Sequence, residues 1–383
     1  MSSSGPLATH LRTVFGKAPV AALSLGVAAL LSIEPARAQL KLDTGKEIYE
    51  TACTACHGPD GKGTPKSIAG FEQPRTFPDF TRCDQTTPEL NSDWKAIIRN
   101  GGPFRGFSQI MPAFRDALTS EQMDKVIQYL RAFCEDSGWP RGELNLPRAL
   151  VTEKAYPENE AVITTSFPAR GAPSVQNEIV HEQRFGTKNQ IEVSVPVNFQ
   201  DQNHTWYGGF GDAALGWKRE IFSSLRGGSI LSVQGEVSFP TGNASHGLGS
   251  GVTTFETFAA YGQLLPGKSF LQLQAGSELP LDTAVSPRAL FWRTVFGKSF
   301  NQDHGLGRMW SPMVEMLADR DLRTGARTDW DVLPQMQVTL SRRQHIRANA
   351  GVRVPVTNTA GRAPQVMFYL LWDWQDGRLT EGW

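Results

Sequence analysis

Hydrophobic and polar residues follow a period of two over the second half of the chain. The alternation begins near residue 176 and runs in stretches of about ten residues. The clearest stretches are IEVSVPVNFQ (191–200), LSVQGEVSF (231–239), LQLQAGSEL (271–279), WDVLPQMQVTL (330–340), IRANAGVRVPV (346–356) and VMFYLLWDW (366–374). This pattern is typical of β-strands with unlike faces. Turn-like stretches separate them, so residues 176–383 predict an all-β antiparallel barrel of about twelve strands.

The first part of the chain has helical spacing instead. DTGKEIYETAC (43–53) and PELNSDWKAIIRNGG (88–102) read as helices, and Gly101 is a stop signal for the second. TSEQMDKVIQYLRAFC (119–134) begins with a Thr/Ser cap and repeats its apolar residues at helical spacing. We therefore expect an all-α domain over residues 39–138.

Residues 139–175 join the two parts. This segment is rich in Pro, Glu and Arg and has no sustained period, so it is predicted to be an extended linker. EAVITTSF (160–167) would fit one strand inside it.

Residues 1–38 are predicted to be a cleaved signal peptide. A positive start precedes the apolar run APVAALSLGVAALL (18–31), and ARA (36–38) forms a small-x-small cleavage site. The alternative is an uncleaved anchor, but the run is short for a bilayer. Export places the protein in an oxidising compartment.

Charge and composition narrow the classes of partner. Lys plus Arg and Asp plus Glu both number 38, so the chain carries no net charge. Nucleic acid is therefore not an expected partner, because its binding needs a basic face. Alternation alone does not say which face of the strands meets water, so a soluble sandwich or barrel stays open. The strand length, the aromatic last strand and the aromatic residues near strand ends favour an outer-membrane barrel. Those aromatic residues are Trp206, Tyr207, Trp330, Trp372 and Trp374.

Cys53-x-x-Cys56-His57 is a signature of covalent haem attachment. Two thiols add to the haem vinyl groups, and the following imidazole is the proximal iron ligand. A redox pair or half a zinc site is the alternative, but a zinc site needs two more ligands at matching spacing. One haem c is therefore the predicted cofactor.

Met111 is the predicted second axial ligand. Residues 58–140 contain no His and only two Met, Met111 and Met123. Met123 lies in the apolar stripe of the last helix and is expected in the core. Met111 lies in a loop that Pro112 stiffens, which suits a weak thioether ligand, although a loop Met that fills a core gap is the alternative.

Cys83 and Cys134 are the two cysteines outside the haem-attachment motif. In an exported protein two spare cysteines are expected to form a disulfide, while one buried and one free thiol is the alternative.

Residues 43–134 resemble the class I cytochrome c domain. The likeness is carried by Cys53, Cys56, His57 with Gly58, the Met111-Pro112 pair and the final helix with Tyr129. In that family a Gly of the first helix packs against an aromatic residue of the last helix. Gly45 and Tyr129 are the matching residues here.

The second half resembles outer-membrane barrels associated with uptake of small, often aromatic compounds. HEQRFG (181–186), GDAALGWKR (211–219), SFPTGNASHGLGSG (238–251) and LPGKSFLQLQAG (265–276) carry that likeness. The order of domains resembles fused monohaem cytochrome–porin proteins, some of which move electrons at the bacterial outer surface during metal oxidation. The barrels of those proteins are larger.

The expected function is electron transfer by a His/Met-ligated haem tethered to the outer membrane. An even-stranded barrel has both ends on the periplasmic side, so the haem domain should face the periplasm and meet a periplasmic redox protein. No enzyme activity is expected, because both axial positions of the iron are filled. The alternatives are an outer-membrane pore that a haem domain senses or gates, and a soluble periplasmic cytochrome subunit with a β domain.

Overall fold

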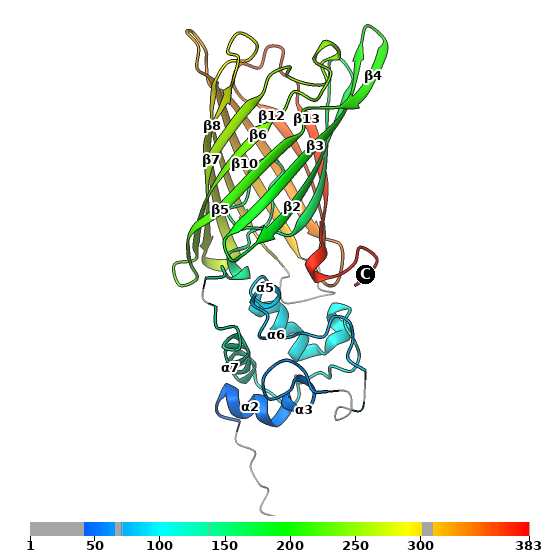
Figure 1. Ribbon diagram of the computed structural model, residues 1–383, viewed down its shortest axis with the longest axis vertical. Coiled ribbons are helices and arrows are strands. Elements are labelled where there is room, and N and C mark those ends of the chain that lie inside the picture. The colour runs from blue at the N-terminus through cyan, green and yellow to red at the C-terminus, as the bar shows by residue number, and fades with distance from the viewer. Residues whose placement is uncertain (1–41, 66–69, 71, 137, 301–308, 383) are drawn as a thin grey trace, which may run out of the picture. The chain divides into compact units, whose positions relative to one another are not determined.

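The computed structural model describes residues 42–382 except 66–69, 71, 137 and 301–308. The predicted signal peptide, residues 1–38, lies outside the described residues. A small helical domain comes first and a β-barrel follows it, as predicted (Figure 1). Among the described residues, no helix is long and apolar enough to cross a bilayer.

The helical domain is built from short amphipathic helices. They are α2 (Gly45–Ala52), α3 (Thr54–His57), α5 (Cys83–Thr86), α6 (Asn91–Asn100) and α7 (Ser120–Arg131), with the 3₁₀ turn η2 (Gly102–Arg105). Thr44 and Thr119 begin α2 and α7 with capping boxes, and Gly101 ends α6 with a positive φ of 83°. The buried faces of these helices meet in one hydrophobic cluster. It contains Ile48, Tyr49, Phe80, Ile98, Leu118, Met123, Val126, Ile127 and Leu130.

The barrel is formed by long antiparallel strands joined in chain order. They are β1 (Glu160–Pro168), β2 (Ser174–Phe185), β3 (Asn189–Gln202), β4 (Thr205–Phe210), β5 (Ala214–Ser224), β6 (Ser229–Ser238), β7 (Thr254–Leu265), β8 (Ser269–Pro280), β9 (Ala289–Lys298), β10 (Trp310–Asp321), β11 (Asp329–Thr339), β12 (Ile346–Pro355) and β13 (Gln365–Asp373). Five 3₁₀ turns complete the described structure: η2, η3 (Gly142–Leu144), η4 (Ala244–His246), η5 (Pro266–Lys268) and η6 (Trp374–Asp376).

The first and last strands close the ring. β1 pairs with β13 on one side and with β2 on the other, so Glu160 lies opposite both Asp373 and Glu182. β4 pairs only with the distal part of β3, and β3 pairs with β5 through its other part. The closed ring therefore has twelve strands, as predicted, and β4 extends one hairpin beyond it.

The barrel begins at Glu160, earlier than the predicted boundary at residue 176. Residues 176–383 supply only eleven of the ring's strands, and a ring of even strand number needs one more. β1 is that strand, and it comes from within the predicted linker 139–175. The segment predicted as an extended linker therefore supplies one strand of the barrel. Its residues 144–159 also differ from the prediction, because they pack inside the barrel.

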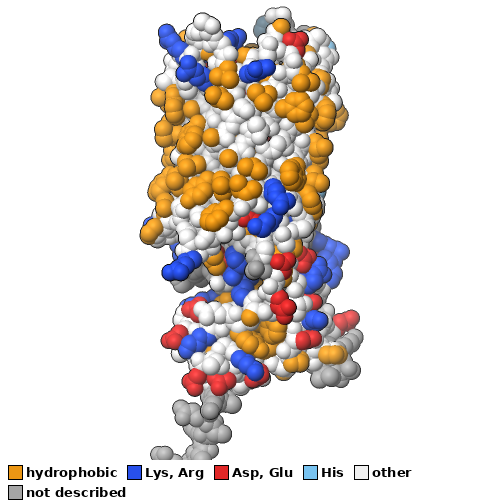
Figure 2. Space-filling view, turned by 60° about the vertical axis from the view of Figure 1, so that its left-hand side comes forward, with side chains coloured by type: hydrophobic (Ala, Val, Ile, Leu, Met, Phe, Trp, Pro, Cys, Tyr) orange, Lys and Arg blue, Asp and Glu red, His pale blue; other side chains and the backbone are white. Residues whose placement is uncertain are grey.

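The outer face of the barrel is apolar and its interior is polar. Large apolar side chains at alternate strand positions are exposed, and Figure 2 shows hydrophobic side chains spread over the barrel's flank. They include Ile163, Ile179, Ile191, Val193, Leu215, Trp217, Val233, Leu290, Trp292, Phe296, Val314, Met316, Phe368 and Leu370. Inward positions on the same strands carry buried polar side chains. These include Glu182, Gln190, Glu192, Lys218, Gln234, Gln272, Gln274, Glu315, Asp331, Gln335 and Asn349.

This inside-out distribution decides between a soluble and a membrane barrel. A soluble barrel buries apolar residues inside and exposes polar ones, whereas a spanning barrel presents an apolar band to lipid around a polar interior. Closed antiparallel barrels of even strand number with this pattern are the architecture of outer-membrane proteins. The barrel therefore belongs in the outer membrane, as predicted.

The two ends of the barrel differ in their connections. Four of the five hairpin connections at the end where β1 begins and β13 ends are short turns, at residues 186–188, 225–228, 266–268 and 340–345, and the fifth, residues 299–309, is longer. The opposite end carries longer connections, such as residues 239–253 and 356–364. Short turns are typical of the periplasmic end of such barrels. The chain therefore enters and leaves the barrel at its short-turn end.

A charge on the outer face should destabilise the barrel. Val233 is the fifth residue of β6 and 40% exposed. We predict that Val233→Arg lowers the free energy of unfolding by about 2–4 kcal/mol, the cost of a cation near the bilayer midplane. Urea titration of the lipid-reconstituted protein measures this, with Val233→Leu as the control. An unchanged unfolding free energy in Val233→Arg would show that this face does not meet lipid.

Candidate functional site

The haem-attachment motif lies at the junction of α2 and α3. Cys53 is the residue between the two helices, and Cys56 and His57 end α3. The N–H groups of Cys56 and His57 both donate to the carbonyl of Cys53, at 3.1 and 2.9 Å. Both thiols and the imidazole therefore come from one tight turn. Cys53 and Cys56 are not bonded to each other.

The chain after His57 folds back over the motif. The N–H of Gly63 donates to the carbonyl of His57 and the N–H of Thr64 to that of Cys56, both at 2.9 Å. The Tyr49 hydroxyl donates to the Gly58 carbonyl at 2.6 Å. Gly58 has a positive φ of 72°, a conformation that other residues rarely adopt. This loop holds His57 in place from its backbone side.

The His57 side chain is set among aromatic rings and is neutral. Its ring stacks on Phe77 at 5.0 Å between centroids and contacts Phe80 at 5.2 Å. Burial lowers the pKa of His57 to about 4. Its Nδ1 atom is buried without a hydrogen-bond partner. A neutral imidazole with an unpaired buried nitrogen is what a metal ligand requires.

The Cys53 thiol is also uncharged before any reaction. Burial and the neighbouring Cys56 raise the pKa of the Cys53 thiol to about 11. Neither cysteine is fully exposed. A neutral Cys53 thiol beside an aromatic-lined imidazole fits an apolar ring system better than a thiolate-bound zinc ion, since zinc needs deprotonated sulfur.

Met111 lies in a loop, as predicted, and packs against the same hydrophobic cluster as the motif. The cluster includes Phe80, which contacts the His57 ring, and both Met111 and Cys53 pack against it. The carbonyl of Met111 accepts a hydrogen bond from the N–H of Gly102 at 3.0 Å. Met123 is 2% exposed and lies in the centre of the cluster. Of the two candidate methionines, Met111 is thus the one outside the packed centre.

Gly45 and Tyr129 meet where α2 crosses α7. A Cβ atom at Gly45 would lie 2.1 Å from the Lys125 carbonyl oxygen and 3.0 Å from the Tyr129 Cβ. Only glycine fits this approach. The contact predicted from the cytochrome c resemblance is therefore present.

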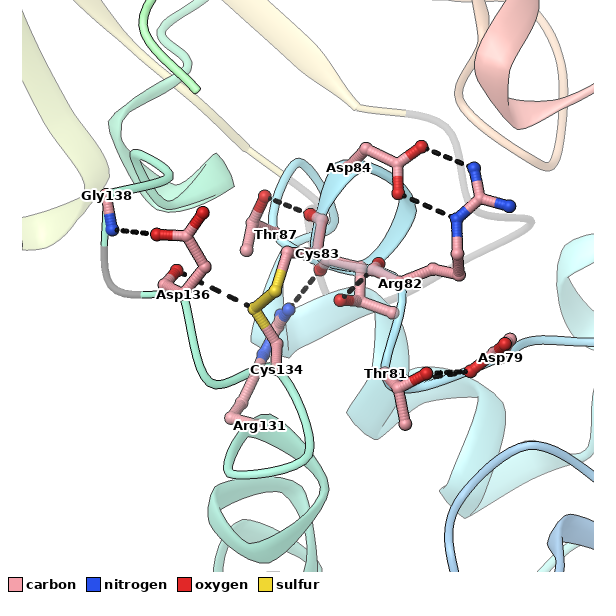
Figure 3. Close-up of a disulfide and its surroundings, with 11 residues drawn as sticks. Asp79, Thr81, Arg82, Cys83, Asp84, Thr87, Arg131, Cys134, Asp136 and Gly138 are labelled. Atoms are coloured by element: carbon pink, nitrogen blue, oxygen red, sulfur yellow. Dashed lines mark hydrogen bonds and ion pairs between the residues drawn. A yellow bond between two sulfur atoms is a disulfide. The ribbon is translucent and has the colours of Figure 1, made fainter. Parts of the chain in front are cut away.

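Cys83 and Cys134 form a disulfide (Figure 3). It ties α5 to the segment after α7 and closes a loop across a sequence separation of 51 residues. Around it, the Arg131 guanidinium donates to the carbonyls of Thr86 and Glu89 and lies 3.7 Å above the centroid of the Trp94 ring. The bond and the arginine fix the chain where it leaves the helical domain.

The segment that leaves the helical domain fills the barrel lumen. We call residues 144–159 the plug. Apolar residues of the plug pack against apolar patches on the inner wall: Leu144, Ala155 and Tyr156 on one, Leu146 and Ala149 on a second, and Leu150 on a third. The first patch belongs to β6, β7 and β9, and the second to β8, β9 and β10. The third belongs to β1, β2, β11 and β13. The plug therefore touches the wall on all sides.

One carboxylate holds the centre of the plug. Glu315 lies midway along β10 and is fully buried. It accepts the N–H groups of Leu150 at 2.9 Å, Val151 at 3.2 Å and Thr152 at 2.9 Å, and the Thr152 hydroxyl at 2.6 Å. Backbone donors inside a lumen need such acceptors, because an unpaired buried N–H costs stability.

Ion pairs hold the rest of the plug. Arg148 contacts Glu160 at 3.0 Å and Glu182 at 2.9 Å, and its carbonyl accepts the Tyr369 hydroxyl at 2.8 Å. Lys154 pairs with Glu158 and Glu160. The predicted linker had no signal for this role except three leucines close together, Leu144, Leu146 and Leu150, which an exposed linker would not need.

Comparison with known proteins gives one family for the helical domain. Residues 40–130 match the model of "Cytochrome C oxidase, cbb3-type, subunit III". No curated protein matches the chain.

The barrel is similar to solved outer-membrane proteins. The COG4313 outer membrane channel from Pseudomonas putida F1 is 12% identical, with a TM-score of 0.39 over 59% of this chain and 98% of that chain. The KdgM porin is 5% identical, with a TM-score of 0.37 over 56% and 98%. The NanC porin is 8% identical, with a TM-score of 0.38 over 55% and 97%. By the family match of residues 40–130 and by its own strand pairing, the chain joins a cytochrome c-like domain to a closed twelve-stranded barrel.

The disulfide should stabilise the helical domain. Closing a loop of this length contributes about 4 kcal/mol by the chain-entropy model. We predict that the double variant Cys83→Ser/Cys134→Ser loses about 2–4 kcal/mol of unfolding free energy in this domain. Circular dichroism at 222 nm, where helices dominate the signal, follows it during urea unfolding of the full chain, with the single change Ser92→Ala as a control nearby. Equal midpoints in wild type and double variant would contradict the prediction.

Glu315 should keep the lumen closed. In Glu315→Ala, the N–H groups of Val151 and Thr152 lose their acceptor at a cost of about 1–3 kcal/mol each, while the Leu150 N–H keeps the Gln335 Oε1 at 3.0 Å. We predict that this variant conducts ions in planar bilayers at least tenfold more than the wild type. Glu315→Gln is the matched control, because it keeps the shape and one acceptor oxygen, and it should conduct less than Glu315→Ala. A wild type that already conducts as well as Glu315→Ala would show that the plug does not close the pore.

Proposed function

We propose that the protein transfers single electrons through one haem c, which its barrel holds at the outer membrane. Cys53 and Cys56 would attach the haem covalently, and His57 and Met111 would be the ligands of its iron. The observation that carries the proposal is the neutral, aromatic-lined His57 with its unpaired Nδ1, next to two unbonded thiols. The cytochrome match over residues 40–130 supports it.

When bound, the haem would supply a one-electron couple whose potential the axial ligands tune. The residues of the chain bind and orient it. The backbone bonds of Gly63 and Thr64 fix the motif, Phe77 and Phe80 orient the imidazole, and the loop at Met111 supplies a thioether from the same cluster. Two protein ligands leave no open position at the iron, so electron transfer is favoured over substrate turnover and no enzyme activity is proposed.

The barrel serves as an anchor in this proposal. The chain enters it at the short-turn end, which is typically periplasmic, so the haem domain would face the periplasm. A periplasmic redox protein would then be its electron donor or acceptor. One haem on that side does not carry electrons across an apolar band about 25 Å tall.

The plug weighs against the pore alternative. A solute pathway needs an open lumen, whereas residues 144–159 contact the inner wall all around it. The apolar outer face likewise weighs against a soluble periplasmic subunit. No observation favours the pore or the soluble subunit over the membrane anchor.

Replacing the axial methionine tests the proposal. We predict that Met111→Ala changes the haem absorption spectrum and lowers the reduction potential by on the order of 100 mV, within the range of about 0.8 V that axial ligands command. Met123→Leu is the matched control, because Met123 is the other methionine of the domain and lies in its core. Spectroelectrochemical titration of the purified full chain gives both readings.

If Met111→Ala and Met123→Leu have the same spectrum and potential as the wild type, Met111 is not a ligand. If His57→Ala retains a normal low-spin haem spectrum, the attachment site itself is misplaced.

A further inference from the structure

Acidic side chains from the plug and the wall converge in the lumen, near the short-turn end of the barrel. Glu153 of the plug, Glu182 of β2 and Glu192 of β3 each place a carboxylate oxygen within 4.8 Å of the other two. Glu182 and Glu192 are direct cross-strand partners, so their side chains point into the lumen from neighbouring strands. Both are nearly inaccessible, with exposures of 0% and 4%.

The surrounding ion pairs do not neutralise this group. Glu153 contacts Arg148 at 3.1 Å and Lys218 at 3.5 Å. The connected network of buried charges has five carboxylates and three cations, so with all groups ionised it carries two negative charges. Its members are Glu153, Glu158, Glu160, Glu182, Glu192, Arg148, Lys154 and Lys218.

Two buried oxygens at this place have no partner. Glu182 uses one oxygen for Arg148, while its Oε2 is buried without a hydrogen bond. Gln234, 3% exposed, has a buried Oε1 without a partner. The Gln234 side chain lies beside Gly216, which is next to Glu192 and Glu236. A Cβ atom at Gly216 would lie 3.1 Å from the Gln234 Nε2 and 3.3 Å from the Glu236 Oε2. Unpaired buried oxygens beside excess negative charge are features of a cation site.

We propose that Glu153, Glu182 and Glu192 bind one divalent cation that ties the plug to the barrel wall. Oxygen-only donors select hard cations such as Ca²⁺ or Mn²⁺. Two oxygens bound to one Ca²⁺ at about 2.4 Å lie at most about 4.8 Å apart, which fits the spread of the three carboxylates. Two positive charges would also balance the network. Because Glu153 belongs to the plug and the other two ligands to the wall, the cation links the two.

Glu192→Gln is the variant that tests the proposed cation site most directly. Among the residues that the structure describes, Glu192 makes no ion pair, and its one side-chain hydrogen bond comes from Gln190 at 3.3 Å. The substitution therefore removes a charge and leaves the pairs of Arg148, Lys154 and Lys218 in place. Glu256→Gln is the matched control, since Glu256 is another lumen-facing glutamate on β7, opposite Glu236 and Glu278.

The experiment uses the full haem-bearing chain. Each protein is unfolded in urea with EDTA, refolded in detergent with MnCl₂, desalted and analysed for manganese, while the shift between boiled and unboiled samples on a gel reports a folded barrel. We expect one Mn²⁺ per chain in the wild type and in Glu256→Gln, and at least tenfold less in Glu192→Gln.

Two results would overturn the proposal. If the folded wild type retains no Mn²⁺, protons and not a metal ion neutralise the excess carboxylates. This result comes from the wild type alone and does not require any variant to fold. Equal retention in Glu192→Gln and Glu256→Gln means that the metal is bound elsewhere.

Discussion

Closure of the barrel by β1 is the constraint on which the rest of the structure depends. Within a bilayer, backbone N–H and C=O groups find no water, so every strand must pair on both sides. Residues 160–168 supply the strand that pairs with both β2 and β13. This fixes where the chain enters the barrel, namely at the short-turn end beside the last strand. It also leaves the residues just before Glu160 at the mouth of a polar lumen.

The plug follows from that position. A twelve-stranded ring encloses a narrow lumen lined by buried charges such as Glu315 and Glu182. The plug donates backbone N–H groups to Glu315 and pairs Arg148 with one oxygen of Glu182, and it adds apolar contacts along the wall. The same segment begins just after the disulfide-fixed end of the helical domain. One continuous piece of chain therefore leaves the cytochrome domain, fills the barrel and closes it.

Sequence reasoning found the elements that depend on local pattern. The period of two located strands of the ring beyond residue 176, and the glycine stop at Gly101 placed the end of α6. The spacing of Cys53, Cys56 and His57 located the candidate haem site because covalent chemistry fixes that spacing. Only the structure showed which face of the strands meets lipid, because a soluble barrel and a membrane barrel have the same alternation of polar and apolar residues.

The plug and the start of the barrel could not be predicted in the same way. Residues 144–159 have no regular period, because their partners are side chains of many strands and not their own neighbours in sequence. The convergence of Glu153 with Glu182 and Glu192 likewise depends on strand register and on the path of the plug. Such contacts are long-range, and a single sequence carries little signal for them.

The central claim is that one chain carries both a haem and an outer-membrane barrel. A haem-stained gel of purified outer membranes, run with and without boiling, tests it most directly. The account predicts a haem band in the outer-membrane fraction whose mobility changes on heating, because a folded barrel migrates differently from the unfolded chain. Haem found only in the soluble periplasmic fraction would contradict the account.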